Sequence, residues 1–180
     1  MSYCTYCREP NISQVHIDYH DHVYGYPVET DNELFGRLVL EINQAGLSWE
    51  LILKKKKYFE LAFDGFDVSI VAGYDEADRD RLRNDTRIIR NRLKINAAIH
   101  NAQQILQIQA EFGTFKKWLD DHHPRSKDEW VTLFKKRFKF VGGEIVNEYM
   151  MALGYLPGAH DENCPVFDTI MTMNPKWSQI

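Results

Sequence analysis

Long apolar runs are missing from this chain of 180 residues. Although 44% of the residues are hydrophobic, none of the apolar runs approaches the roughly 18 residues needed to cross a bilayer. The N-terminal segment MSYCTYCREP has neither the basic start nor the apolar core of a secretion signal. We therefore expect a soluble protein of the cytoplasm with no membrane partner.

Disulfide bonds are also not expected, because the chain has 3 cysteines, an odd number, and no signal for export. Those thiols are left for metal binding or for burial in the core. Internal repeats, low-complexity tracts and Gly/Ser linkers are absent as well. A length of 180 residues then predicts one domain with a core of its own.

A net excess of positive charge is missing: 22 Lys and Arg face 26 Asp and Glu, a formal charge of -4. This balance disfavours nucleic-acid binding, since basic side chains supply most of the affinity for phosphate. The distribution is uneven, however, and the segments 86–110 and 130–143 contain no acid. Solvated helix faces explain such stretches as well as a DNA contact does. Their main basic residues are Arg87, Arg90, Arg92, Lys94, Lys135, Lys136, Arg137 and Lys139.

No segment alternates convincingly with the period of a strand, so we predict an all-α fold. Thr30 with Glu33, and Ser126 with Glu129, have the spacing of a capping box at a helix start. Apolar residues then recur at three- and four-residue steps until a glycine ends the helix. The predicted helices run from Thr30 to Gly46, from Ser48 past Phe59, from Asp75 to Leu82, and over 88–112, 114–121, 126–137 and 144–154.

Four residues near the two ends of the chain have the chemistry of a zinc site. Cys4 and His20 lie near the start, and His160 and Cys164 lie near the end in the spacing H-x3-C. Two thiolates and two imidazoles complete a tetrahedral shell with no open position, which is typical of a structural zinc ion. Cys7 is an alternative ligand, because Cys4-x2-Cys7 is itself a common ligand pair. Unrelated core or surface positions would explain the same residues.

The segment FKFVGG at 138–143 separates a basic helix end from the helix predicted at Glu144. Glycines at such a turn let the backbone approach DNA phosphate, and the amide groups at the following helix N-terminus form an anion site. We therefore hypothesise a DNA contact at Arg137, Lys139, Gly142 and Gly143. A plain structural turn is the competing interpretation, since a basic helix end also suits the helix dipole.

Aromatic and acidic residues gather in the first third of the sequence. Glu41 precedes the segment QAGLSW, which ends at Trp49, while Tyr6, Tyr19 and Tyr24 occur in the same region. Aromatic faces with one carboxylate suit a flipped, positively charged purine. Glu41 has apolar neighbours on its predicted helix, so its burial would call for a cationic partner. An exposed glutamate and a core tryptophan are the alternative interpretation.

Taken in order, these motifs resemble those of one family, DNA-3-methyladenine glycosylase I. The resemblance covers roughly residues 3–165 and implies the helix-hairpin-helix glycosylase architecture. We therefore expect a glycosylase domain over 1–165 and a loosely ordered tail of unknown role over 166–180. The motifs that carry the resemblance are Cys4, YHD at 19–21, Glu41 ahead of QAGLSW, IIRNRLKI at 88–95, FKFVG at 138–142 and H-x3-C at 160–164.

The resemblance also implies a ligand set and a reaction. A structural zinc ion held by Cys4, His20, His160 and Cys164 would join the N- and C-terminal segments. The reaction would be hydrolysis of the N-glycosidic bond of 3-methyladenine in alkylated double-stranded DNA, after base flipping. Glu41 would be the catalytic residue, and the protein would act as a monomer. The base site would comprise Trp49, Tyr19, Tyr6, Tyr24 and His16.

Some positions depart from the pattern of that family. His16 stands where the family often has tyrosine, Tyr6 and Tyr24 stand where tryptophans are common, and Arg137 replaces the glycine usual before FKFVG. Glu144 occupies the place where strand-cleaving glycosylases carry a lysine nucleophile. We therefore expect a monofunctional enzyme without a lyase step, whose base preference differs in detail.

Two other classes of function are compatible with the same residues. The first is a non-catalytic, zinc-stapled module that binds damaged DNA. The second is a zinc hydrolase, which requires one vacant ligand position, although the H-x-E…P-C-x-x-C pattern of zinc deaminases is absent. Release of free base from methylated DNA separates an enzyme from a binding module.

Overall fold

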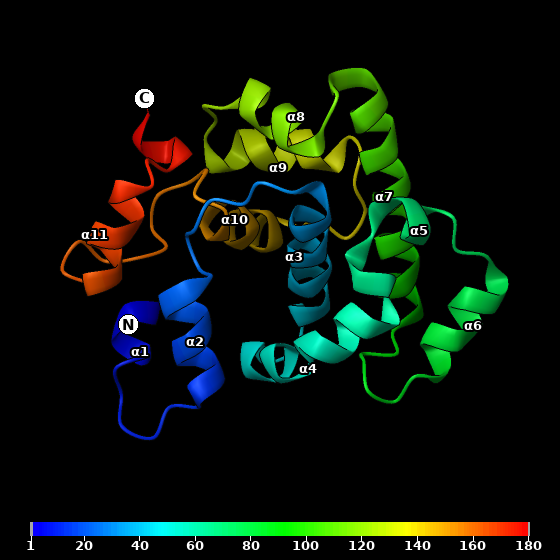
Figure 1. Ribbon diagram of the computed structural model, residues 1–180, viewed down its shortest axis with the longest axis horizontal. Helices are drawn as coiled ribbons and strands as arrows, with labels where there is room; N and C mark the ends of the chain where they lie inside the picture. Colours follow the sequence, from blue (N-terminus) through cyan, green and yellow to red (C-terminus); the bar gives the residue numbers. More distant parts are fainter. Residues whose placement is uncertain (1, 180) are drawn as a thin grey trace.

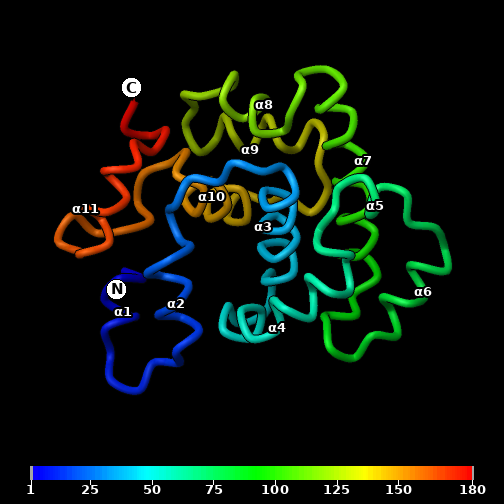
Figure 2. The backbone as a smooth tube through the Cα atoms, in the orientation of Figure 1, coloured from blue at the N-terminus to red at the C-terminus, as the bar shows by residue number. Residues whose placement is uncertain are grey.

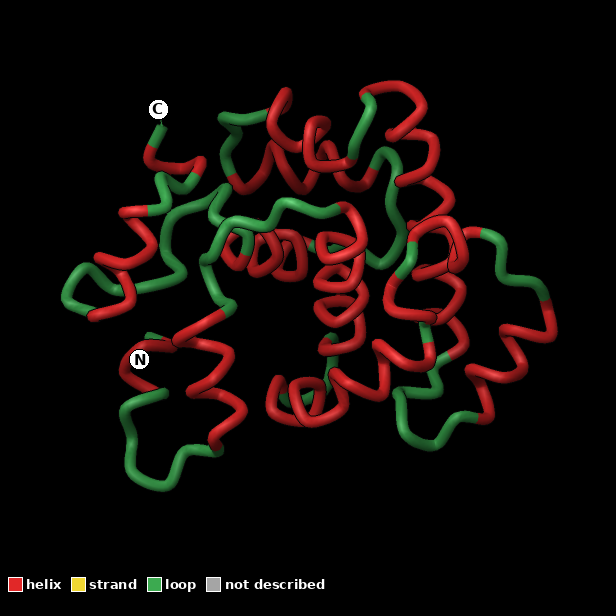
Figure 3. The backbone as a smooth tube through the Cα atoms, viewed as in Figure 1, coloured by secondary structure: helices red, strands yellow, loops and turns green. Residues whose placement is uncertain are grey.

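The computed structural model describes residues 2–179, and within that range it contains helices and loops without a strand (Figure 3). The prediction of an all-α fold is therefore confirmed. Two 3-10 turns, η1 (Asp64–Phe66) and η2 (Lys176–Ser178), supplement the α-helices. The α-helices are α1 (Tyr3–Tyr6), α2 (Gln14–His22), α3 (Asp31–Gln44), α4 (Trp49–Ala62), α5 (Val68–Ala72), α6 (Glu76–Asn84), α7 (Arg92–Phe112), α8 (Phe115–His122), α9 (Lys127–Lys135), α10 (Gly143–Ala152) and α11 (Pro165–Thr172).

The helix starts predicted at Thr30 and Ser126 are confirmed by their caps. The Ser126 side chain accepts a hydrogen bond from the Glu129 backbone, and the Glu129 carboxylate accepts one in return, which completes a capping box. Thr30 accepts from the Glu33 amide at 3.3 Å. The Glu33 carboxylate instead pairs with Arg37 at 2.7 Å, so only half of the capping box predicted at Thr30 forms. Each cap satisfies an amide that the first helical turn leaves unpaired.

The longest helix begins later than its apolar pattern indicates. The pattern predicts a start near Ile88, whereas α7 starts at Arg92. Asn91 precedes it, and its side-chain oxygen accepts hydrogen bonds from the amides of Leu93 and Lys94 at 3.0 and 3.1 Å. An asparagine side chain that bonds these amides replaces the backbone carbonyl that a longer helix would supply, and so it sets the start of α7.

Four helices were not expected from the sequence: α1, α2, α5 and α11. α11 lies in the segment expected to be a loosely ordered tail. Its first residue is Pro165, a favoured residue at a helix start, and its Ile170 is buried. The end of the chain is also held, since the Trp177 amide donates to the Gly154 carbonyl at 3.1 Å.

The core surrounds α3, which lies between α10 and α7 near the middle of the molecule (Figure 1). Its residues Leu34, Leu38 and Ile42 recur at helical spacing and are fully buried in the main hydrophobic cluster. The buried Tyr149 hydroxyl on α10 donates to the Leu34 carbonyl at 2.9 Å. This packing fixes the orientation of α3, the helix that carries Glu41.

The two ends of the chain lie on the same side of the molecule, where α1 and α2 approach the segment that leads into α11 (Figure 2). A small second cluster of Tyr24, Ala152 and Ala159 lies between them. The Gly25 amide donates to the Ala152 carbonyl at 2.9 Å and ties the N-terminal segment to α10. No helix among the described residues is long and apolar enough to span a bilayer.

Candidate active site

Glu41 lies in the last turns of α3 and is 7% exposed. Burial raises the pKa of its carboxyl to about 8, and the nearby Glu148 carboxyl acts in the same direction. The Arg37 guanidinium opposes both effects without forming an ion pair with Glu41. Burial of this carboxyl thus favours its protonated form.

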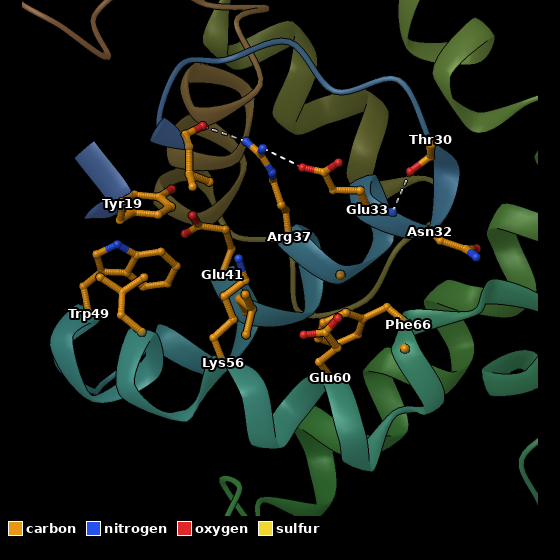
Figure 4. A pocket seen from close by; sticks show the side chains of 15 residues that line it. Tyr19, Thr30, Asn32, Glu33, Arg37, Glu41, Trp49, Lys56, Glu60 and Phe66 are labelled. Carbon is orange, nitrogen blue, oxygen red and sulfur yellow. Dashed lines mark hydrogen bonds and ion pairs between the residues drawn. The ribbon is translucent and has the colours of Figure 1, made fainter. Parts of the chain in front are cut away.

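Two aromatic side chains lie beside this carboxyl (Figure 4). Tyr19 projects from α2 and Trp49 begins α4, so the helices that precede and follow α3 in the chain supply them. The rings are in an edge-to-face arrangement with centroids 5.1 Å apart. Ser48 accepts from the Leu51 amide and fixes the helix start that places Trp49. The sequence prediction that these three residues lie together therefore agrees with the geometry.

Glu41, Tyr19 and Trp49 line two adjoining cavities, of about 400 and 370 Å³. The first extends between α3 and α4 and has charged residues of both signs on its walls, among them Arg37 and Lys56. The second extends from the same three side chains toward the N-terminus and α10. Glu41, Tyr19 and Trp49 thus form the wall that both cavities share.

The second cavity is aromatic and acidic. Tyr3 and Tyr24 add two rings to those of Tyr19 and Trp49, and Glu148 adds a second carboxylate. The Tyr24 hydroxyl donates to Glu148 Oε2 at 3.1 Å, and burial raises the pKa of Glu148 above its usual range. Sequence reasoning missed Tyr3 and Glu148. Their spacing gave no signal, because α1 was not expected and α10 was interpreted only as a DNA contact.

Tyr6 and His16, two of the predicted base-binding residues, are not among the residues that line either cavity. They pack behind Tyr3 instead. The His16 ring is buried, lies 2.8 Å from the Tyr3 hydroxyl through Nδ1, and meets the Tyr6 ring edge-on at 5.1 Å. Their geometry suits support of Tyr3 rather than contact with a base in these cavities.

The four predicted zinc ligands meet in the structure. The ligand atoms of Cys4, His20, His160 and Cys164 all lie within 4.8 Å of one another, and all four residues are buried. α1 supplies Cys4, α2 supplies His20, and the loop before α11 supplies the other two. Cys7 is not in this group, and its thiol donates to the His16 carbonyl at 3.7 Å. The choice of His20 over Cys7 agrees with this arrangement.

The spacing of these atoms fits a tetrahedral zinc ion. Cys4 Sγ lies 3.6 Å from His160 Nδ1, and Cys164 Sγ lies 3.8 Å from both that atom and His20 Nε2. Zinc–sulfur and zinc–nitrogen bonds of ordinary length at the tetrahedral angle give an S–N separation of about 3.6 Å. The donor atoms therefore lie where such a shell needs them.

Hydrogen bonds orient both imidazoles for this role. His160 Nε2 donates to the Tyr24 carbonyl at 2.8 Å, and His20 Nδ1 donates to the Asp21 carboxylate at 2.7 Å. In each ring the other nitrogen, which faces the cluster, then keeps its lone pair. Protein metal sites commonly fix the histidine tautomer in this way.

The loop between α9 and α10 is held by side chains of α7. The Lys139 amide donates to Asn101 Oδ1 at 2.8 Å, and Asn101 Nδ2 donates to the Lys139 carbonyl at 3.1 Å. His100 Nε2 donates to the Arg137 carbonyl at 3.0 Å. Asn101 is fully buried, so the turn is built into the fold and its shape is fixed from beneath.

The predicted DNA contacts lie on this loop. A Cβ placed on Gly142 or Gly143 would meet nothing within 4 Å, so neither glycine is required by packing inside the protein. Gly142 caps α10 without a side-chain hydrogen bond, which leaves the first amides of α10 without that partner. Lys139 is exposed, whereas the Arg137 guanidinium is paired with Glu111 at 3.1 Å.

Lys94 connects α7 to the end of α3. Lys94 is 5% exposed. Its ammonium donates to the carbonyls of Asn43 and Ala45 at 2.8 and 2.7 Å. It also lies 6.0 Å from the ring centroid of Phe140, in the loop before α10. One side chain thus links the turn that precedes Trp49 to the loop that was predicted to contact DNA.

Proteins of known sequence are similar to this chain. The DNA-3-methyladenine glycosylase 1 of Escherichia coli (strain K12) is 36% identical, over 78% of this chain and 85% of that protein. The DNA-3-methyladenine glycosylase of Haemophilus influenzae is 30% identical, over 89% of this chain and 97% of that protein.

Solved structures have the same fold class. The 3-methyladenine DNA glycosylase I of Staphylococcus aureus matches with a TM-score of 0.75 at 33% identity, covering 88% of this chain and 92% of that chain. A variant of 3-methyladenine DNA glycosylase I in complex with 3-methyladenine matches with a TM-score of 0.78 at 32% identity, covering 92% of this chain and 97% of that chain. The molecule is thus an all-helical protein with a glycosylase fold.

The family itself follows from the sequence match. The model of the methyladenine glycosylase family matches residues 9–132. This chain belongs to the methyladenine glycosylase family, which confirms the resemblance drawn from its motifs.

Proposed function

We propose that this protein removes 3-methyladenine from alkylated DNA by hydrolysing its N-glycosidic bond. The observation that supports the proposal most directly is the buried Glu41 carboxyl, which lies beside Tyr19 and Trp49 and forms no ion pair within residues 2–179. A buried acid without a counter-charge costs free energy unless a cation reaches it. Methylation at N3 gives adenine a positive charge, so the lesion itself is that cation.

The chemistry needs little acid catalysis. The bond between C1′ and N9 breaks, its electron pair neutralises the positive base, and water adds to C1′ with loss of a proton. The protein must flip the nucleotide, hold the cation and admit water. Glu41 binds the base and stabilises positive charge as the bond breaks, while Tyr19, Trp49 and Tyr24 enclose it. Tyr6 and His16 act indirectly, through Tyr3.

The loop between α9 and α10 is the proposed DNA contact, as the hairpin of a helix-hairpin-helix. Gly142 and Gly143 let a phosphate approach the amides at the start of α10, where the helix dipole favours an anion. Lys139 adds charge beside it. Arg137 joins this contact only by exchanging its partner Glu111 for a phosphate. Glu144 in place of a lysine leaves no nucleophile for strand cleavage, so the protein is monofunctional.

Cys4, His20, His160 and Cys164 hold a structural zinc ion in this proposal. Such an ion stabilises the fold by joining α1 and α2 to the segment before α11, and it supplies no group to the reaction because all four positions are protein ligands. Metal analysis of purified protein should give about one zinc per chain. Cys164→Ser should lose the metal and lower the melting temperature. Cys7→Ser is the matched control and should retain it.

The main test is release of the base. Methylated DNA is incubated with the protein, and free 3-methyladenine is measured by chromatography beside a Glu41→Gln control. Release that exceeds this control supports the proposal. Release no greater than the control would leave the alternative, a non-catalytic zinc-stapled module for damaged DNA. A monomer in light scattering under the same conditions is expected, because one chain contains the whole cavity.

A further inference from the structure

The start of α7 carries two arginines that have no acidic partner within residues 2–179. Arg90 and Arg92 are exposed, a single residue separates them, and neither forms an ion pair in that part of the chain. Two cations so close together create a positive potential that attracts an anion from outside the chain. A solvated helix face carries the same charges, so the surroundings of the pair decide between the two interpretations. The arginines that do form ion pairs are Arg37, Arg79, Arg81, Arg83, Arg87 and Arg137.

Leu93 follows this pair and is 63% exposed, the largest exposed fraction among the large hydrophobic side chains of residues 2–179. It takes no part in the core, because α7 packs through Ile95, Ala98 and Ile99 instead. A lone exposed leucine would need no explanation. Leu93 is not alone, however, since the residue after it connects to two segments that carry further exposed apolar side chains.

That residue is the buried Lys94. Its ammonium donates to the carbonyl of Ala45 at 2.7 Å, and Ala45 begins the turn that carries Leu47, which is 36% exposed. The same ammonium lies 6.0 Å from the ring centroid of Phe140, which is 38% exposed. Three segments with an exposed apolar residue thus meet at one side chain. We call the exposed residues of these segments the Lys94 surface: Arg90, Arg92, Leu93, Leu47 and Phe140.

Duplex DNA is the partner whose chemistry fits this surface. The Lys94 surface is continuous with the loop between α9 and α10, the proposed DNA contact, and with the turn between Gln44 and Trp49, two residues of the cavity wall. Its arginines belong to the segment 86–110, which contains no acid, and they match the charge of phosphates. Apolar side chains on a DNA-facing surface pack against sugars and bases.

We propose that Arg90, Arg92 and Leu93 form a second DNA contact, in which the two guanidinium groups bind backbone phosphates and the leucine packs against a deoxyribose. The inference rests on the proposed function and deepens it, because it adds a second place where the protein holds the duplex. Flipping a nucleotide costs unstacking energy, and contacts with the rest of the duplex must supply it. Phosphate contacts also fix the position of the protein on the strand.

The test measures binding to an undamaged duplex, which needs no catalysis. Fluorescence anisotropy over a salt series gives the affinity and the slope of log K against log salt. The variants are Arg92→Ala, the double variant Arg90→Ala/Arg92→Ala, and Leu93→Ala. Lys117→Ala is the control for net charge, because Lys117 lies on α8, at the other end of α7, and pairs with Asp121 (Figure 1).

Arg92→Ala should reduce the slope by about 0.9 and the double variant by about 1.8, since each arginine loses one phosphate contact. Leu93→Ala should weaken binding about threefold without changing the slope, because apolar contact is lost and charge is not. Lys117→Ala should change neither quantity. All four proteins should unfold in urea as the intact protein does, because the substituted side chains are exposed.

Slopes that stay the same in Arg92→Ala and in the double variant would overturn the proposal. An equal reduction in Lys117→Ala would overturn it as well, because the effect would then come from net charge alone. Calorimetry with free 3-methyladenine gives a third check: weaker binding of the base by Arg92→Ala would assign this residue to the base cavity instead. A Leu93→Ala variant with unchanged affinity for DNA would contradict the apolar part of the contact.

The two proposals fail separately in this design. An intact protein whose DNA binding changes as expected in these variants but which releases no base would contradict the proposed reaction and retain the second contact. Normal release of 3-methyladenine, together with unchanged slopes in the arginine variants, would contradict only the second contact.

Discussion

Lys94 and Glu41 are both ionisable side chains that the fold buries near the end of α3, and their surroundings differ. The Lys94 ammonium donates to two backbone carbonyls, of Asn43 and Ala45. Within residues 2–179 the Glu41 carboxyl forms no ion pair, and it opens onto two cavities. A buried charge with its hydrogen bonds complete holds a structure together, whereas one left incomplete stores free energy that a ligand can release.

The largest expected effect comes from removing the unpaired acid, Glu41. Glu41→Gln keeps the size of the side chain and its ability to hydrogen-bond, but cannot neutralise a cationic base. We expect kcat/KM for release of 3-methyladenine to fall about 1000-fold, or roughly 4 kcal/mol of transition-state stabilisation. Single-turnover release from methylated DNA measures this. A loss of less than about threefold would mean that Glu41 is a structural residue like Lys94.

The same substitution should make the protein without ligand more stable at high pH. The Glu41 pKa is about 8 when folded and near 4.5 when unfolded. Between those values the folded state keeps a proton that the unfolded state has lost, so stability falls as pH rises through the window and the loss is complete above pH 8. Arg37 lowers this pKa while Glu148 raises it; Tyr19 and Tyr24 face the same carboxyl.

Glutamine does not titrate, so Glu41→Gln should be more stable than the natural chain by on the order of 3 kcal/mol at about pH 8.5 and nearly equal to it at about pH 4.5. Urea unfolding of both proteins at several pH values measures the difference. If the two curves ran parallel, Glu41 would not be the buried acid that the structure shows.

Breaking the satisfied charge should cost stability instead. Lys94→Met retains the length of the side chain but leaves the Asn43 and Ala45 carbonyls without their donor. We expect a loss of about 2 kcal/mol in the free energy of unfolding, because unpaired buried carbonyls are costly. Lys57, an exposed lysine on α4, provides the control: Lys57→Met should stay within about 0.5 kcal/mol. Equal effects at the two positions would remove the distinction between the charges.

The sequence predicts most of the fold where local chemistry decides it. Caps such as Ser126 and Thr30, and apolar residues at helical spacing, act within a few residues, so their signals are visible in the chain itself. α2 was missed because its buried side is made of His16 and His20 rather than of aliphatic residues. Its packing depends on partners distant in sequence, and those partners have no periodic signal.

The site was predictable to the same extent. An acid and two aromatic residues, Glu41, Tyr19 and Trp49, are recognisable from their residue types and their spacing in the sequence. The predicted zinc ligands have the H-x3-C spacing at one end of the chain. Glu148 and Tyr3 reach the cavity only through the packing of α10 and α1 against the N-terminal segment. Tyr6 and His16 are near Tyr3 and Tyr19 in sequence, yet the fold places them one layer behind Tyr3.

An exposed charge completes the comparison and should have the smallest effect. Lys139 lies in solvent on the loop before α10, and Asn101 holds its backbone through both the amide and the carbonyl, so Lys139→Ala should not disturb the loop. We expect binding to undamaged DNA to weaken only a few-fold at low salt, with the slope of log K against log salt reduced by about 0.9, since one phosphate contact is lost. Fluorescence anisotropy over a salt series measures both quantities. An unchanged slope would place Lys139 outside the DNA contact. A changed preference between damaged and undamaged DNA would mean that this exposed charge takes part in base recognition.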